Sequence, residues 1–227
     1  MKLSIIIPVF NEEKFIKEII ERVFGAPIKD EKEIIVINDG STDNTKNILE
    51  NLINNYNFKL INHEHNLGKG SAIKTGLSIV TGDLIIIQDA DLEYDPKDIP
   101  LLLSQMSKNI SAVYGKRGLK NWSRLHYALG AKLLTILINI LFHANLHDTY
   151  TCYKLFNLNK ISLGLLKNLT SSGFEFEAEI TCKILKSGGK ISETPIHYFP
   201  RSKKEGKHIG FKDFIKGFVI IIKCRFH

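Results

Sequence analysis

Three acidic residues, spaced two apart, follow an apolar run in the sequence. Residues 84–88 are typical of a buried β-strand, and Asp89, Asp91 and Glu93 come directly after them. If the strand continues in extended form, its alternate side chains point to one side, so the three carboxylates gather there. Hard oxygen ligands of this kind suit Mg²⁺ or Mn²⁺. The trio predicts a metal site that bridges a diphosphate; the alternative is a solvated acidic loop.

A further acidic residue, Asp39, follows a second apolar run at residues 33–37 and stands beside the hydroxyl groups of Ser41 and Thr42. A carboxylate at this place can accept hydrogen bonds from a base or a ribose. It can equally stabilise the turn and the helix start that follow it. The sequence leaves both interpretations open.

The elements that would position these residues alternate along the first half of the chain. Short apolar runs are followed by polar turns and amphipathic stretches, which is typical of a parallel sheet flanked by helices. We predict strands at residues 3–7, 33–37, 58–61 and 84–88, of which the first, second and fourth are buried. Ligands of such sheets bind beyond the carboxyl ends of the strands, so the residues after these three strands should meet in one crevice.

Two helices are predicted between the first three strands. The first has Asn11 as its N-cap and presents an apolar face formed by Ile16, Ile19, Ile20 and Val23. The second opens at Ser41 and Thr42 and carries its apolar residues as far as Leu52.

Composition limits the fold and the compartment. A length of 227 residues with 44% apolar content is enough for one main domain with one substantial core. Cys152, Cys182 and Cys224 are widely spaced and show neither a zinc-site nor a disulfide pattern, so we interpret them as reduced thiols of a cytosolic protein. The apolar run at the N-terminus is too short for a signal peptide.

The charge of the chain is basic and unevenly distributed. The net charge is +7, yet the first 100 residues hold 11 Lys and Arg against 17 Asp and Glu, and the remainder holds 20 against 7. The segment 201–208, RSKKEGKH, is strongly cationic. This balance favours an anionic partner, such as nucleic acid, a phosphorylated substrate or an acidic membrane face, and does not choose among them.

Eight ordered blocks carry a family resemblance. Four in the first half read SIIIPVFNEE, INDGSTDNT, NLGKGSAIKTG and GDLIIIQDADLEYDP, and four later ones begin at Tyr114, Asp148, Gly173 and Pro195. Together they resemble the family-two, GT-A-type inverting glycosyltransferases, and most of all the dolichol-phosphate and polyprenyl-phosphate sugar synthases. The resemblance implies an α/β fold of the GT-A type, with a mainly parallel sheet flanked by helices and amphipathic helices towards the C-terminus.

The same resemblance implies roles for individual residues. A GDP- or UDP-linked sugar would bind at Pro8, Phe10, Glu12, Ile37, Asp39, Lys69, Asp89, Ala90 and Asp91. The metal, Mg²⁺ or Mn²⁺, would be held by Asp91 and Glu93, although the position of Glu93 varies in the family. Asp89, Asp91 and Arg117 would be catalytic. Phe10 stands where the family often has Tyr and keeps a stacking face, and Lys69 is either near the donor or a surface lysine at a helix start.

The acceptor implied by the resemblance is a polyprenyl phosphate. Such a phosphate has a second pKa near ~6 and is already an anionic nucleophile, so it needs cations more than a base. Arg117, Arg201 and Lys207 would supply these cations. Direct displacement would convert an α-linked donor into a β-linked product. The resemblance divides the single domain into three parts. Residues 1–115 would bind the nucleotide sugar, residues 116–210 would bind the acceptor, and residues 211–227 would form a basic amphipathic segment.

Two apolar stretches bear on membrane association. Residues 129–144 are interrupted by Lys132, Thr135 and Asn139, so they predict an amphipathic helix that lies in a membrane interface or packs on the core. Residues 211–226 alternate apolar side chains with lysines and predict a basic amphipathic helix. We therefore expect a cytoplasmic protein at the cytoplasmic face of a membrane, either peripheral or bound to a separate membrane partner, and no nucleic-acid partner.

The sequence supports other chemistries less well. Lys69 is followed by Gly70 rather than Ser or Thr, so the block is not a phosphate-binding P-loop. His143 and His147 lack the glutamate of a zinc-protease helix, and we give them no role. The acidic run at 175–179 either supplies a base for a hydroxyl acceptor or supports structure, and the role of Asp148 is open. The alternatives are a transferase for saccharide hydroxyls, although its Gln-x-x-Arg-Trp motif is absent, and a non-catalytic binding module.

Overall fold

A computed structural model describes residues 1–118, 125–201 and 211–226. The described strands form one seven-stranded sheet in the order β3-β2-β1-β4-β6-β5-β7. Their bounds are β1 Lys2–Val9, β2 Glu31–Asn38, β3 Lys59–Asn62, β4 Leu84–Ile87, β5 Ala112–Arg117, β6 Lys154–Asn157 and β7 Ile191–Ile196. The helices are α1 Ile16–Gly25, α2 Thr45–Leu52, α3 Lys69–Ser78, η1 Pro96–Asp98, α4 Ile99–Gln105, α5 Leu125–Phe142, α6 Leu163–Lys167, α7 Phe176–Lys186 and α8 Phe211–Phe226.

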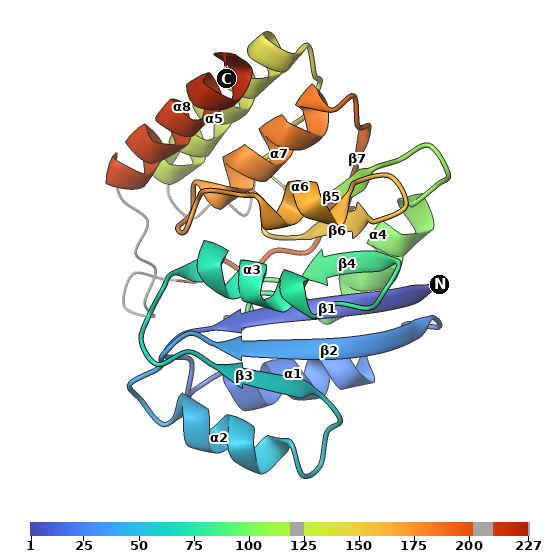
Figure 1. Ribbon diagram of the computed structural model, residues 1–227, viewed down its shortest axis with the longest axis vertical. Helices are drawn as coiled ribbons and strands as arrows, with labels where there is room; N and C mark the ends of the chain where they lie inside the picture. Colours follow the sequence, from blue (N-terminus) through green and yellow to red (C-terminus); the bar gives the residue numbers. More distant parts are fainter. Residues whose placement is uncertain (119–124, 202–210, 227) are drawn as a thin grey trace.

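The predicted parallel sheet is confirmed in its first half, where β1, β2, β3 and β4 run in one direction. The second half is mixed, because β6 lies antiparallel between β4 and β5, while β7 is parallel to β5. The predicted strands begin and end within two residues of the observed ones, and β1, β2 and β4 are the buried strands. A single sheet therefore continues from the first half of the chain into the second (Figure 1).

Helices cover both faces of the parallel part. Alternate side chains of β2 point to opposite faces: Ile34 and Val36 join the core beneath α1 and α2, whereas Ile35 and Ile37 pack with Ala72 of α3. α3 approaches β1 closely, because a β-carbon added at Gly76 would lie 2.6 Å from the side chain of Ile6. The layers are therefore helix, sheet and helix (Figure 1).

The starts of the first two helices differ from the prediction. Asn11 is not the N-cap of α1, which begins five residues later with Phe15 at its cap. Instead Asn11 adopts a positive φ of 53°, and its side chain accepts a hydrogen bond from Thr42 N at 2.8 Å. Likewise α2 begins at Thr45 rather than at Ser41. The polar residues expected to cap the helices therefore join the loops after β1 and β2 to each other.

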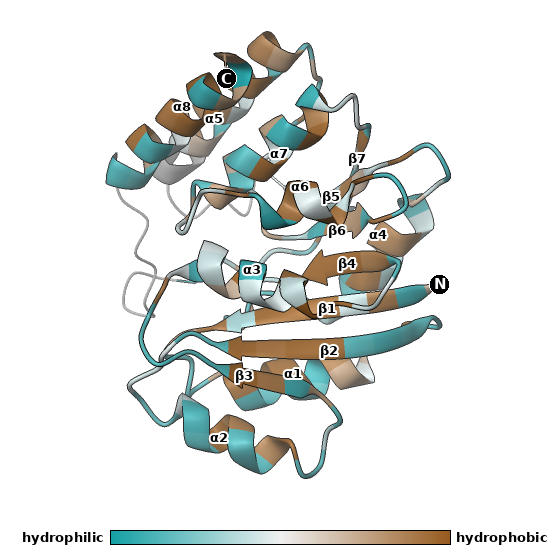
Figure 2. Cartoon of the chain, in the orientation of Figure 1, coloured by the Kyte–Doolittle hydropathy of each residue, from teal (hydrophilic) through white to brown (hydrophobic). Residues whose placement is uncertain are grey.

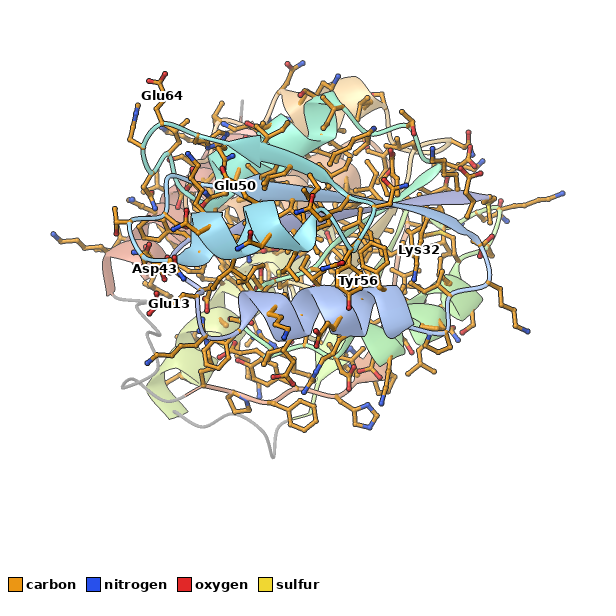
Figure 3. All side chains as sticks on the ribbon, turned by 90° about the horizontal axis from the view of Figure 1, so that it is seen from below. Glu13, Lys32, Asp43, Glu50, Tyr56 and Glu64 are labelled. Atoms are coloured by element: carbon orange, nitrogen blue, oxygen red, sulfur yellow. The ribbon has the colours of Figure 1, made fainter. Side chains whose placement is uncertain are left out.

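A further pair of bonds links the same two loops. Glu13 N donates to the Asp43 carboxylate at 3.2 Å, and Asn44 N donates to the Glu13 carboxylate at 3.0 Å. Figure 3 shows Glu13 and Asp43 near each other at one end of α1 and α2, with Lys32 towards the other end. These bonds hold together the segments that leave the carboxyl ends of β1 and β2.

The second half adds a helical layer of its own. α5 and α8 pack beside α7 around a small core formed by Leu134, Ile138, Ala178, Cys182 and Ile221. Figure 1 shows the three helices stacked at the end of the molecule opposite to α2. No helix in the part of the chain that the structure describes is long and apolar enough to cross a membrane.

Candidate active site

The candidate site lies where β1, β2 and β4 end, as the sequence predicted. Asp39 N donates to Val9 O at 2.8 Å and Gln88 N donates to Ile6 O at 2.9 Å, so the segments that leave the three strands stay in register. Phe10, Asp39 and Asp89 follow these strands. The carboxyl edge of the parallel sheet thus brings together residues from three distant parts of the sequence.

Asp39 is held inside this edge. It is 2% exposed, and its carboxylate accepts hydrogen bonds from His63 Nδ1 at 2.6 Å, Leu67 N at 3.0 Å and Gly68 N at 2.8 Å. His63 Nε2 in turn lies 2.9 Å from Thr75 Oγ1. Asp39 therefore fixes the loop that leads from β3 into α3, and its predicted contact with a base or ribose stays a prediction.

The other predicted nucleotide residues differ in accessibility. Pro8 and Ile37 are buried in their strands, and Ala90 is 3% exposed. These side chains therefore lie beneath the surface at the carboxyl ends of the strands. Phe10 is 42% exposed and presents its ring for stacking. Glu12 is partly buried, and burial raises the pKa of its carboxyl group although the neighbouring Arg201 acts in the opposite direction.

The acidic trio lies in a turn and not on an extended strand, so the geometric argument for its shared direction is wrong. β4 ends at Ile87, and Leu92 adopts a left-handed φ of 60°. The carboxylates nevertheless remain neighbours: burial, then the charges of Asp89 and Glu93, raise the pKa of Asp91 to about 7, while Arg201 opposes the shift. One guanidinium, that of Arg201, is shared between Asp91 and Glu12, so the carboxylates around the turn outnumber the cations paired with them.

This excess of charge is the feature that fits a divalent cation. Mg²⁺ commonly takes one or two protein carboxylates and completes its coordination with phosphate and water. Asp91 with Asp89 beside it offers such a pair. Among the described residues, no three His, Cys, Asp or Glu side chains form a ready metal cluster.

Glu93, the other predicted metal ligand, forms hydrogen bonds with other residues of the protein through both carboxylate oxygens. It is 6% exposed, and its two carboxylate oxygens accept hydrogen bonds from Tyr198 Oη at 2.9 Å and Arg201 N at 2.8 Å. Its backbone oxygen accepts from Phe199 N. Glu93 thus attaches the segment after β7 to the acidic turn.

Arg201, predicted to bind an acceptor phosphate, lies across this turn with carboxylates as its partners, and the phosphate contact stays a prediction. Its guanidinium donates to both oxygens of Glu12 at 3.0 Å each and to Asp91 Oδ2 at 3.2 Å, and it lies 5.6 Å from the ring centroid of Phe15. Lys207, predicted beside it, lies outside the described residues. Arg201 connects the loop after β1 with the loop after β4.

Arg117 is the last residue of β5 and forms a bidentate ion pair with Asp148. The distances are 2.7 Å from Nε to Oδ2 and 2.9 Å from a terminal nitrogen to Oδ1. Asp148 is 1% exposed, and its own backbone N–H donates to Glu193 of β7. Sequence reasoning left the role of Asp148 open; the structure makes it the partner of Arg117.

Lys69, at the start of α3, is turned towards Asp89. Its Nζ lies 2.9 Å from Asp89 Oδ1, 3.1 Å from Cys152 Sγ and 3.5 Å from Glu177 Oε1. Lys69 is therefore a residue of the site and not a free surface lysine. The participation of Cys152 and Glu177 was missed, because nothing in their spacing connects them with Asp89.

The glycines on either side of Lys69 permit this approach. A β-carbon at Gly68 would lie 2.5 Å from Ser172 O, and one at Gly70 would lie 2.7 Å from Ser171 O. Gly70 N also donates to Ser172 O at 2.8 Å. The Gly-Lys-Gly sequence thus allows α3 to begin directly against the loop that precedes α7.

Comparison with known proteins now decides the class of this site. Residues 4–162 match the family model described as Glycosyl transferase family 2. The chain belongs to this family. The predicted enzyme class, a glycosyltransferase, and the predicted GT-A fold are confirmed.

Solved structures agree with the fold of this family-2 glycosyltransferase. Glucosyl-3-phosphoglycerate synthase from Mycobacterium tuberculosis, solved with Mn²⁺, uridine diphosphate and phosphoglyceric acid, matches with a TM-score of 0.75 at 16% identity, over 99% of this chain and 78% of that one. The same enzyme with Mg²⁺ and uridine diphosphate gives a TM-score of 0.73 at 17% identity, over 99% and 79%. At these identities the likeness establishes the fold.

Proposed function

We propose that this glycosyltransferase moves a sugar from a nucleoside diphosphate to the phosphate of a polyprenyl lipid at a membrane surface, with inversion at the anomeric carbon. The observation that carries the donor half of this proposal is the turn of Asp89, Asp91 and Glu93. It lies at the carboxyl edge of the sheet, where Lys69 pairs with Asp89 and one guanidinium, that of Arg201, is shared between Asp91 and Glu12. A divalent ion would neutralise these carboxylates and would also bind the donor diphosphate.

The residues that would hold Mg²⁺ or Mn²⁺ are Asp91 and Asp89. The glucosyl-3-phosphoglycerate synthase structures, which carry Mn²⁺ or Mg²⁺ with uridine diphosphate, support a metal in this chain also. When bound, the ion would act as a Lewis acid on the departing diphosphate. The protein's own contribution is to exclude water with Ala90, to stack the base on Phe10 and to hold the acidic turn through Glu93 and Tyr198.

The lipid half of the proposal rests on the outer face of α5 and α8. Thr135 and Asn139 of α5 point inward, where they bind the loop at 146–149, so the outward side is apolar. The exposed apolar side chains of the two helices are Leu129, Leu133, Ile136, Ile140, Ile215, Phe218, Val219 and Phe226. Figure 2 shows brown segments along both helices, interrupted by teal on α8.

A groove between the two helices extends this face. Its volume is about 280 Å³, and it is lined by Leu133, Leu134, Ile136, Leu137, Ile140, Phe214 and Phe218. Exposed Lys132, Lys212, Lys216 and Lys223 lie on the same two helices. Apolar side chains with basic neighbours suit the boundary of an anionic bilayer. We therefore propose a peripheral protein at the cytoplasmic face of a membrane, alone or with a separate membrane partner.

A second candidate is a transferase with a soluble or saccharide acceptor. It is favoured by the engagement of Arg117 with Asp148 and of Arg201 with Glu12 and Asp91, since an acceptor phosphate would have to compete with these carboxylates. One of the two matching structures also contains phosphoglyceric acid, which is not a lipid. Here Glu175, which has one buried carboxylate oxygen without a hydrogen-bond partner in the described part of the chain, is the candidate base.

One assay separates the two candidates. Purified protein is incubated with Mn²⁺ or Mg²⁺, a panel of UDP- and GDP-sugars, and either a short polyprenyl phosphate or a set of soluble acceptors. Mass spectrometry then identifies the product, and NMR assigns its anomeric configuration. We expect a metal-dependent β-linked sugar lipid. Transfer only to a soluble acceptor would favour the second candidate, and a retained configuration would contradict the inverting mechanism.

A further inference from the structure

Four charged side chains of alternating sign form a line from the candidate donor site into the interior. Asp89 pairs with Lys69, whose Nζ is 3.5 Å from Glu177 Oε1, and the other oxygen of Glu177 binds Lys154 Nζ directly. Asp89 and Lys69 belong to the first half of the chain, whereas Lys154 is on β6 and Glu177 is in the first turn of α7. The line therefore crosses between the two halves.

The two ends of this line differ in exposure. The side chains of Asp89 and Lys69 are each 19% exposed, whereas those of Glu177 and Lys154 are 5% and 0% exposed. Lys154 also donates to Thr151 O and lies 4.9 Å from the ring centroid of Tyr114. The inner pair is thus fixed by its surroundings, and the outer pair is open to a ligand.

The inner pair needs an explanation other than stability. Packed apolar side chains of the same volume often stabilise a core as well as a buried ion pair does. Moreover, Glu177 Oε1 has no hydrogen-bond partner in the described part of the chain and lies 3.5 Å from Lys69 Nζ in an ion pair. This oxygen is aimed at the ammonium group that faces the donor site.

We propose that Glu177 and Lys154 are positioning residues, which hold Lys69 Nζ at the place where it stabilises the leaving nucleoside diphosphate. The inference rests on the proposed donor. In the transfer step an acceptor oxygen forms a bond to the anomeric carbon while the bond from that carbon to the diphosphate oxygen breaks. The bonding electron pair remains on the diphosphate, and Lys69 neutralises part of the charge that develops there.

The geometry around Lys69 agrees with this role. Its ammonium group lies between Asp89 on the donor side, at 2.9 Å, and Glu177 on the inner side, at 3.5 Å. Glu177, behind the ammonium group, is out of the ligand's way and keeps the group in place.

The experiment compares binding of the diphosphate with binding of the nucleoside. UDP and GDP are titrated in the presence of Mn²⁺ by calorimetry, and uridine and guanosine by NMR, into wild type, Lys69→Met, Lys69→Arg and Glu177→Gln. The control is Glu33→Gln, which removes another partly buried glutamate that is paired with a lysine, Lys59, at the opposite edge of the sheet.

We expect Lys69→Met to weaken diphosphate binding by about tenfold to a hundredfold and Glu177→Gln by about tenfold, with nucleoside binding unchanged. Lys69→Arg should recover part of the loss, and the control should bind like wild type. If Glu177→Gln does not fold, the double variant Lys154→Met/Glu177→Gln removes both charges of the inner pair and should show the same selective loss.

Two results would overturn the inference. If the Glu177 variants lose nucleoside and diphosphate affinity equally, Glu177 is a structural residue only. If they bind the diphosphate like wild type, Lys69 does not depend on them, while the proposed function stands. Wild-type protein that transfers sugar to no acceptor and binds neither UDP nor GDP would overturn the proposed function together with this inference.

Discussion

The two ends of the sheet use charged residues in different ways. At the ends of β1, β2 and β4, the side chains of Asp89 and Asp91 are 19% and 16% exposed. Around β5 and β6, the partners Asp148 and Lys154 are 1% and 0% exposed. The first end presents its charges to a ligand, whereas the second uses buried ion pairs to hold its framework.

The apolar residues show the opposite contrast. α1, beside the first end, buries Ile16, Ile19, Ile20 and Val23 against the sheet. α5, at the second end, turns Ile136 and Ile140 outward and its polar Thr135 inward. This contrast agrees with the proposal of a polar donor at the first end and a lipid at the second. Each of the following variants tests one side of it.

The largest effect is expected at Asp148. Asp148→Asn leaves the buried guanidinium of Arg117 without its bidentate partner, which should lower the free energy of unfolding by about 3–5 kcal/mol. Denaturation in urea measures the loss. The matched change Glu18→Gln removes an exposed helix ion pair with Arg22 and should cost less than about 0.5 kcal/mol. Equal losses would remove the contrast between buried and exposed pairs.

Asp91→Asn should affect activity more than stability. The variant keeps the size of the side chain but loses the charge that faces the proposed cation, so kcat should fall by about 10²- to 10³-fold. The assay is sugar transfer at saturating donor and metal. The control is Asp95→Asn, in the turn before η1, where the carboxylate accepts from Lys97 N. If Asp91→Asn retains wild-type activity, Asp91 does not hold the proposed metal ion.

Lowering the pH should destabilise the fold at both ends of the sheet, because Glu33 and Glu179 become protonated. Hydrogen bonds from Ser4, Thr81 and Lys59 outweigh burial and lower the pKa of Glu33 to about 2, and bonds from Ser171, Lys183 and Thr170 do the same for Glu179. A lowered folded-state pKa gives stability that is present above the unfolded value near 4.5 and is lost as the pH falls through 2.

Each of these carboxylates should contribute on the order of 2 kcal/mol at neutral pH. Glu33→Gln and Glu179→Gln should therefore flatten the loss of stability between pH 5 and pH 2, as measured by urea denaturation at each pH. An unchanged acid profile in either variant would show that its carboxylate is not held at that end of the sheet.

The smallest effect is expected on the outer apolar face. Ile140→Glu and Phe218→Glu should each weaken binding to anionic lipid vesicles by about tenfold, because each removes a half-exposed apolar side chain from the bilayer boundary. Leu101→Glu on α4 is the control, since Leu101 is similarly exposed at 43% but lies away from α5 and α8. Equal effects at all three positions would contradict a specific lipid face.

The sequence predicted the first end of the sheet well for physical reasons. β1, β2 and β4 are buried on both faces, so they appear as continuous apolar runs, and the ligand edge follows directly from their ends. The position of the acidic residues was therefore predictable. Their turn was not, because the left-handed conformation of Leu92 leaves no signature in a Leu residue.

The second end could be predicted only in outline. Its ion pairs join residues that are far apart in the sequence, such as Arg117 with Asp148 and Lys154 with Glu177, and no local pattern specifies such a pairing. The side of α5 that faces the protein interior could not be predicted from the sequence either. In the sequence Thr135 and Asn139 are polar interruptions of an apolar run, and the structure turns them inward through hydrogen bonds to the loop at 146–149.

The place of β6 in the sheet has a consequence for how the chain is made. Among the described strands, β5 pairs with β6 and β7, both of which follow it in the sequence, and β6 also links β5 to β4. Between Arg117 at the end of β5 and Lys154 at the start of β6 lie 36 residues, and a ribosome adds them in roughly 2 to 7 seconds. During this interval the edge of β4 is open on the nascent chain, and a chaperone that covers it would protect the protein when it is most prone to mispairing.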